Sequence, residues 1–162
     1  MLLIKNGYMI DPKSGWDGNY DILVENDTIV RIGKRLETPK GKCRIIDVEG
    51  LLVAPGLVDV HAHFRDPGFT MKEDIVTGAA AAARGGYTSV VLMANTKPTV
   101  DNLDTLKYVI GRGKETGIHV YTCANVTMGM KGKELTPMRE LAAAGAVGFT
   151  DDGIPLMDER IV

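Results

Sequence analysis

The residue types best suited to chemistry gather near position 60. Asp59, His61 and His63 alternate along an apolar segment. Side chains two residues apart on a β-strand share a face, and two imidazoles at this spacing suit a zinc ion. The alternative is a hydrogen-bonded histidine pair at a strand end. Two of the three histidines in the chain fall in this triplet, so we favour a metal site, with Asp59 as a candidate to orient an imidazole.

Two further polar side chains follow predicted strands. Arg65 stands two residues after His63, and its planar guanidinium could bind a substrate carboxylate through two hydrogen bonds. A surface ion pair with Asp66 is the alternative. Asn95 ends the next apolar segment, where its amide could contact a ligand or cap the loop before Pro98.

An acidic pair ends the last apolar segment. Asp151 and Asp152 are adjacent and precede Gly153. Two neighbouring carboxylates repel each other, and a divalent cation would relieve that cost. A solvated turn is the alternative, because Asp-Asp-Gly is also favourable turn sequence.

The elements that must position these groups follow a regular order from residue 57 onward. Apolar strands alternate with helices, which predicts parallel βα units and the α/β class. Strands are expected at 57–64, 87–95, 118–126 and 146–153, and helices at 71–86, 101–117 and 134–145. A complete (β/α)8 barrel needs about 250 residues, so this stretch is close to half of one. A doubly wound sheet is the alternative, but the first βα turn of this sequence lacks the G-x-G-x-x-G phosphate loop expected there.

The first 55 residues differ in character, because short β-rich runs alternate there with turns. The clearest local signal is a hairpin at Glu25-Asn26-Asp27, and a break is expected at Asn6-Gly7 within the first strand.

Composition excludes several classes of function. Lys and Arg number 19 against 21 Asp and Glu, a net charge of −2, which argues against nucleic acid and anionic membranes as partners. No apolar run approaches the roughly 18 residues of a membrane-spanning helix. Cys43 and Cys123 are consistent with reduced thiols, so we expect a cytoplasmic protein.

Four motifs give the sequence a family resemblance. They read VAPGLVDVHAHFRDPG, TGAAAAARGGYTSVV, MANTKP and AVGFTDDG, in this order. Together they resemble the dihydroorotases of the metal-dependent amidohydrolase superfamily, and specifically the bacterial type with an aspartate metal bridge. The resemblance implies a small β-sandwich segment over 1–55, followed by the N-terminal half of a TIM-type (β/α)8 barrel over 56–162.

The resemblance also implies a role for each site residue. His61 and His63 would bind the more buried of two zinc ions, and Asp152 would bridge the pair. His63, Arg65 and Asn95 would contact a small substrate, and Arg65 and Asn95 would bind its carboxylate. The implied reaction interconverts L-dihydroorotate and N-carbamoyl-L-aspartate in pyrimidine biosynthesis. The family's general acid/base and its other metal ligands would lie beyond residue 162, so we expect the chain to be a fragment of a longer enzyme and to be inactive alone.

Other interpretations of the resemblance stay open. The chain could derive from another cyclic amidohydrolase, of the allantoinase or hydantoinase type. It could also be a non-catalytic relative that serves as a partner of aspartate transcarbamoylase. Open strand edges predict association with further copies or with a complementary C-terminal half.

Overall fold

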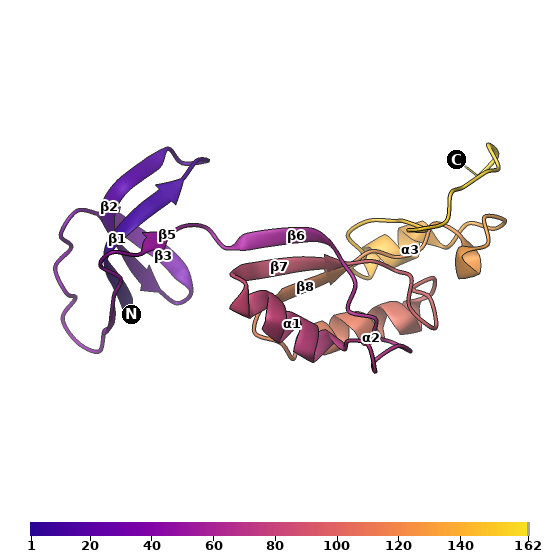
Figure 1. The fold of residues 1–162 in the computed structure, drawn as a ribbon, viewed down its shortest axis with the longest axis horizontal. Coiled ribbons are helices and arrows are strands. Elements are labelled where there is room, and N and C mark those ends of the chain that lie inside the picture. Colours follow the sequence, from indigo (N-terminus) through magenta and orange to yellow (C-terminus); the bar gives the residue numbers. More distant parts are fainter. Residues whose placement is uncertain (162) are drawn as a thin grey trace. The chain divides into compact units, whose positions relative to one another are not determined.

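The computed structural model describes residues 1–161, which divide into two compact units (Figure 1). The first covers Met1–Pro55 and the second begins at Gly56. Each is described by itself below.

The first unit is a mixed five-stranded sheet. Its strands are β1 (Leu2–Asp11), β2 (Trp16–Glu25), β3 (Thr28–Gly33), β4 (Arg44–Asp47) and β5 (Leu52–Val53). The order is β3-β2-β1-β4, with β5 also paired to β1. Neighbours β1, β2 and β3 are antiparallel, whereas β4 and β5 both run parallel to β1. Residues 1–55 therefore form one mixed sheet around β1, where the resemblance implied a β-sandwich segment.

The sequence predicted two local features of this sheet, a hairpin and a break. The structure confirms the hairpin and replaces the break with a bulge. The β2–β3 hairpin is confirmed: Asn26 and Asp27 adopt positive φ values of 46° and 62°, as a tight hairpin turn requires. The predicted break at Asn6-Gly7 is a bulge inside a continuous β1. The φ of Asn6 is 63°, and its backbone N–H donates to the buried Asp21 carboxylate at 2.9 Å, which lets the strand continue.

The second unit is built on a parallel sheet in the order β6-β7-β8. Strands β6 (Leu57–Ala62), β7 (Tyr87–Leu92) and β8 (His119–Thr122) are followed by helices α1 (Ile75–Arg84), α2 (Leu103–Gly113) and α3 (Met138–Ala143) respectively, with a short 3-10 helix η1 (Met128–Met130) before α3. Figure 1 shows α1 and α2 against the same face of the sheet. The α/β class and the three helices are confirmed.

Side-chain caps fix where the two longer helices begin. Asp74 accepts hydrogen bonds from the first turn of α1 and forms a capping box with Thr77. Asn102 caps α2 by accepting hydrogen bonds from the backbone N–H groups of Asp104 and Thr105. The apolar faces of these helices meet β7 in one core, formed by Ile75, Val90, Leu92, Ala94, Val100, Leu106, Val109, Ala124 and Leu141.

The fourth predicted strand is shorter than expected. Segment 146–150 runs parallel to the end of β8, but only Ala124 and Phe149 form a β-bridge. Three backbone hydrogen bonds still hold it there: Val147 N to Thr122 O, Ala124 N to Gly148 O, and Thr150 N to Ala124 O. The sheet of residues 56–161 thus has three full strands, with a fourth segment in register at one edge.

None of the helices within residues 1–161 combines the length and the apolar character needed to cross a lipid bilayer.

Candidate metal centre

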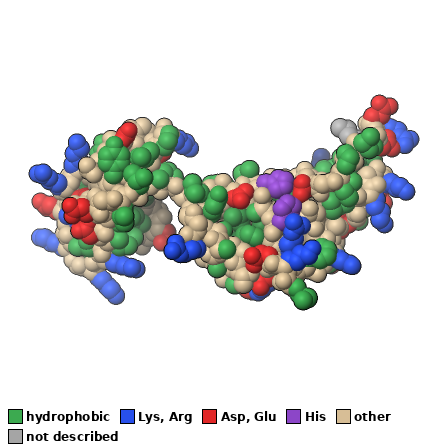
Figure 2. Space-filling view, viewed as in Figure 1, with side chains coloured by type: hydrophobic (Ala, Val, Ile, Leu, Met, Phe, Trp, Pro, Cys, Tyr) green, Lys and Arg blue, Asp and Glu red, His purple; other side chains and the backbone are tan. Residues whose placement is uncertain are grey.

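The candidate residues lie at the carboxyl ends of consecutive strands of the sheet. His61 is the penultimate residue of strand β6, and His63 follows the strand directly. Asn95 lies three residues beyond the end of β7, and Asp152 follows segment 146–150. Parallel strands end at the same edge, so residues far apart in sequence meet there. Figure 2 shows histidine, acidic and basic side chains adjoining one another on the visible face of this unit.

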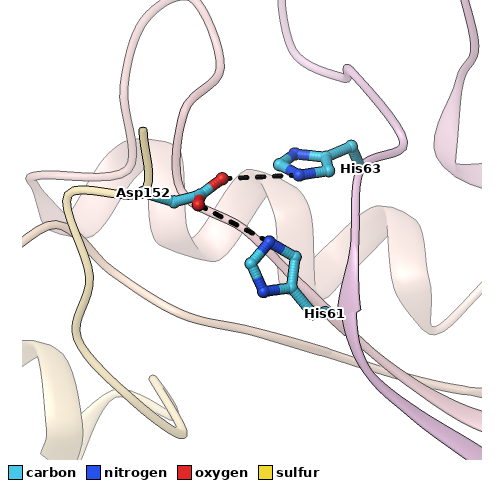
Figure 3. A group of neighbouring side chains, drawn as sticks. All are labelled: His61, His63 and Asp152. Carbon is cyan, nitrogen blue, oxygen red and sulfur yellow. Dashed lines mark ion pairs between the residues drawn. The ribbon is translucent and has the colours of Figure 1, made fainter. Parts of the chain in front are cut away.

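The Asp152 carboxylate faces both imidazoles (Figure 3). Its Oδ1 lies 3.5 Å from His61 Nε2, and its Oδ2 lies 3.4 Å from His63 Nε2. The potential ligand atoms of the three residues all lie within 4.8 Å of one another. The two imidazole planes are inclined by 62°, with ring centroids 5.2 Å apart. Three potential ligands from two separate segments therefore converge on one point.

These separations fit a shared metal ion better than direct hydrogen bonds. Nitrogen–oxygen hydrogen bonds span about 2.7–3.2 Å, shorter than either contact from Asp152. Two ligands bound to one tetrahedral zinc at about 2.0–2.2 Å lie roughly 3.4 Å apart. Two imidazoles and a carboxylate are also a donor set that zinc accepts. The residues present thus fit the ion that the sequence predicted.

Asp151 and Asp152 have different surroundings. Asp151 is buried, and its Oδ1 accepts hydrogen bonds from the backbone N–H groups of Val126 and Thr127, at 2.9 and 3.2 Å. The Thr127 hydroxyl donates to its other oxygen. Asp151 therefore holds the loop after β8, and Asp152 alone of the pair faces the histidines.

Asn95 lies between two of the three candidate ligands. Its Nδ2 donates to Asp152 Oδ2 at 3.1 Å, and its Oδ1 lies 3.1 Å from His63 Nδ1. Sequence analysis expected Asn95 to face the site, but it did not anticipate contacts to candidate metal ligands.

Arg65 and Asp66 do not form the ion pair that was considered as an alternative. The Asp66 carboxylate is buried and accepts hydrogen bonds from Tyr108 Oη at 2.9 Å and from the backbone N–H of Ile75 at 3.4 Å. Partial burial and the hydrogen bond to Asp66 raise the pKa of Tyr108 above its ordinary value. The Arg65 guanidinium forms no ion pair or hydrogen bond with the residues described, 1–161, and so stays available to a ligand.

Asp59 was a candidate to orient an imidazole, but its carboxylate contacts the backbone instead. Its Oδ1 accepts the backbone N–H of His61 at 2.9 Å, because the pairing of β6 with β7 is irregular between Asp59 and Ala62. The carboxylate thus stabilises the backbone of the strand end rather than a histidine ring.

The loops that carry Arg65 and Asn95 are in direct contact. Lys97 N donates to Pro67 O at 3.0 Å. Gly68 has a φ of +92°, and a Cβ there would lie 1.9 Å from Lys97 O. Only glycine permits this approach, which brings the ends of β6 and β7 together.

Sequence analysis did not identify two residues that hold the loops of the site in place. Tyr108 anchors the loop after β6 through Asp66, and Thr127 anchors Asp151. Both contacts join residues more than twenty positions apart. No local pattern signals them.

Comparison with known proteins agrees with this architecture. The family model described as Dihydro-orotase-like matches residues 50–160. The chain is 52% identical over its whole length to dihydroorotase from Clostridium acetobutylicum, and 55% identical to that from Clostridioides difficile. It covers 38% of each relative, so it spans well under half the length of these curated proteins.

A solved structure supports the fold. D-Hydantoinase (dihydropyrimidinase) from Thermus sp. superposes with a TM-score of 0.70 at 30% sequence identity, covering 92% of this chain and 32% of that one. The matched 92% of the chain takes in parts of both the mixed sheet and the βα units. With the family model matching more than half of the chain, these observations show that the chain belongs to the dihydro-orotase-like family.

Proposed function

We propose that the chain is the metal-binding part of a zinc-dependent dihydroorotase that interconverts L-dihydroorotate and N-carbamoyl-L-aspartate in pyrimidine biosynthesis. The observation that carries the proposal is the convergence of His61, His63 and Asp152 at the strand ends of a chain from this family. Two zinc ions would serve the complete enzyme, with Asp152 as the bridge between them. Two free cysteines, Cys43 and Cys123, agree with a cytoplasmic enzyme.

Each group has a chemical task in this proposal. A zinc ion held by His61, His63 and Asp152 would supply Lewis acidity toward the ring carbonyl and activation of water. Arg65, free of other partners among residues 1–161, binds the substrate carboxylate and turns the ring toward the histidines. Asn95 has one N–H left over, which can donate a further hydrogen bond to that carboxylate.

Arg65 also distinguishes dihydroorotate from neutral cyclic amides. The superposed neighbour is a hydantoinase by its printed name. A substrate without a carboxylate would leave the Arg65 guanidinium unpaired, so an acidic ring is the better match. Partners such as a second copy, a complementary C-terminal portion or aspartate transcarbamoylase belong to this proposal as further expectations.

A chimera tests the proposed activity. Residues 1–162 are joined to the portion of Clostridium acetobutylicum dihydroorotase that follows the matched region, and turnover of L-dihydroorotate is compared with that of dihydrouracil, which lacks the carboxylate. We expect turnover of dihydroorotate alone, abolished in the matched chimera carrying His61→Ala and His63→Ala. A folded, zinc-loaded chimera that prefers dihydrouracil, or turns over neither compound, would contradict the proposal.

A further inference from the structure

The Asn95 side chain contacts both His63 and Asp152. Both contacts measure 3.1 Å, one from each end of the carboxamide. The loop that carries Asn95 follows β7, whereas its two partners follow β6 and segment 146–150. The amide therefore links three separate segments at the strand ends.

Chemistry fixes the direction of each hydrogen bond. An ionised carboxylate only accepts, so the group of Asn95 that faces Asp152 must be the NH2. The oxygen then faces His63 Nδ1, and a carbonyl oxygen can only accept. His63 must consequently carry its proton on Nδ1. Its Nε2, 3.4 Å from Asp152 Oδ2, is left with a free lone pair.

His61 lacks a comparable support. Asp59 contacts the backbone of His61 and not its ring, and no side chain within residues 1–161 hydrogen-bonds that ring. The His61 side chain is 55% exposed, against 26% for His63. Of the two imidazoles, His63 is thus the one held in a single orientation.

We infer that Asn95 is a positioning residue of the metal centre: it fixes the His63 tautomer and holds the Asp152 carboxylate toward the same point. This role rests on the proposed metal site and goes beyond the substrate contact that the family resemblance implied. Some residues hydrogen-bond to the atom of a metal ligand that does not bind the metal. Their removal typically lowers metal affinity about 10- to 100-fold.

The first test measures zinc affinity of the 162-residue chain itself, by competition with a chromophoric chelator. Asn95→Leu keeps the size of the side chain and removes both hydrogen bonds, so zinc affinity should fall about 10- to 100-fold. Asn95→Asp retains an acceptor for His63 but repels Asp152, so affinity should also fall. The matched control is Arg65→Gln, a proposed substrate contact that touches no candidate ligand, and its zinc affinity should stay within about twofold of the parent.

The second test reads the tautomer directly. In the metal-free chain, 15N NMR of the neutral imidazole should show the Nδ1–H form of His63, and Asn95→Leu should lose that preference. Unchanged zinc affinity in Asn95→Leu, or an Nε2–H form of His63 in the parent, would overturn the inference. A parent chain that binds no zinc would instead overturn the proposed function, while the tautomer still decides the role of Asn95.

Discussion

The carboxylates of Asp151 and Asp152, adjacent in the chain, serve different segments. Asp151 is buried against Thr127, and Asp152 faces His61 and His63. Asp152 begins the turn after segment 146–150, so the buried contacts of Asp151 fix the backbone from which the Asp152 carboxylate reaches the histidines.

Paired isosteric variants separate these roles. Asp152→Asn should abolish most zinc binding with little change in the free energy of unfolding. Asp151→Asn should retain zinc but lower the free energy of unfolding by about 2–3 kcal/mol, because buried backbone N–H groups lose a charged acceptor. Elemental analysis and urea denaturation of both variants measure the two effects. Zinc loss in Asp151→Asn with full retention in Asp152→Asn would assign the ligand to Asp151.

Arg65→Lys tests substrate binding in the chimera. Lysine keeps the positive charge but loses the planar pair of donors, so kcat/KM for dihydroorotate should fall by an amount equivalent to about 2–5 kcal/mol. Zinc content should not change, because Arg65 contacts none of the candidate ligands. Loss of zinc together with unchanged kcat/KM per bound zinc would show that Arg65 supports the metal instead.

Tyr108→Phe tests the anchor beneath the Arg65 loop. Removing the hydroxyl leaves the buried Asp66 without one donor, and we expect a loss of about 1 kcal/mol in the free energy of unfolding near neutral pH. Tyr121→Phe is a matched control, because Tyr121 and Tyr108 are both 44% exposed and Tyr121 Oη donates to no residue among 1–161. Equal stability of the two variants would show that the contact contributes nothing.

The same contact predicts a pH dependence. The pKa of Tyr108 is raised in the folded chain, so its hydroxyl ionises more readily after unfolding. Its contribution to stability is complete below the unfolded pKa of about 10 and is lost as the pH rises through the higher folded pKa. Urea denaturation between pH 8 and 11 should therefore show a shallower decline for Tyr108→Phe than for Tyr121→Phe. Identical slopes would contradict the assigned cause.

Gly68→Ala tests the contact between the loops after β6 and β7. The new methyl group would overlap Lys97 O in a backbone with φ of +92°, so we expect a loss of roughly 2–4 kcal/mol in the free energy of unfolding. Gly117→Ala provides the control, because nothing lies within 4 Å of its Cβ position. Similar melting temperatures for both variants would show that the contact between the two loops does not require glycine at position 68.

Local sequence patterns predicted the elements whose causes are local. The Asn26-Asp27 turn and the cap-bounded helices depend on residues adjacent in the chain, and all appear in the structure. The alternation of strands and helices also predicted that His61 and Asp152 lie at the same end of the sheet, because the carboxyl ends of parallel strands lie together.

What sequence could not predict depends on distant contacts. An ion pair with the neighbouring Arg65 was the alternative considered for Asp66, but a tyrosine forty-two positions later holds its carboxylate in the interior. Asp59 was a candidate to orient an imidazole on the basis of regular strand alternation, which the irregular pairing at the end of β6 disrupts. Likewise, the contacts of Asn95 with His63 and Asp152 require three separate segments to meet. The spacing of residues within one motif does not predict such contacts.

X-ray absorption at the zinc edge of the zinc-loaded 162-residue chain tests the central claim most directly. We predict scattering from two imidazoles and from oxygen ligands at about 2.0–2.2 Å, with no sulfur at about 2.3 Å. The imidazole signal should decrease in His61→Ala and in His63→Ala and persist in His119→Ala, whose histidine lies at the opposite end of the sheet. A sulfur shell from Cys43 or Cys123, or an imidazole signal unaffected by loss of His61 and His63, would contradict the account.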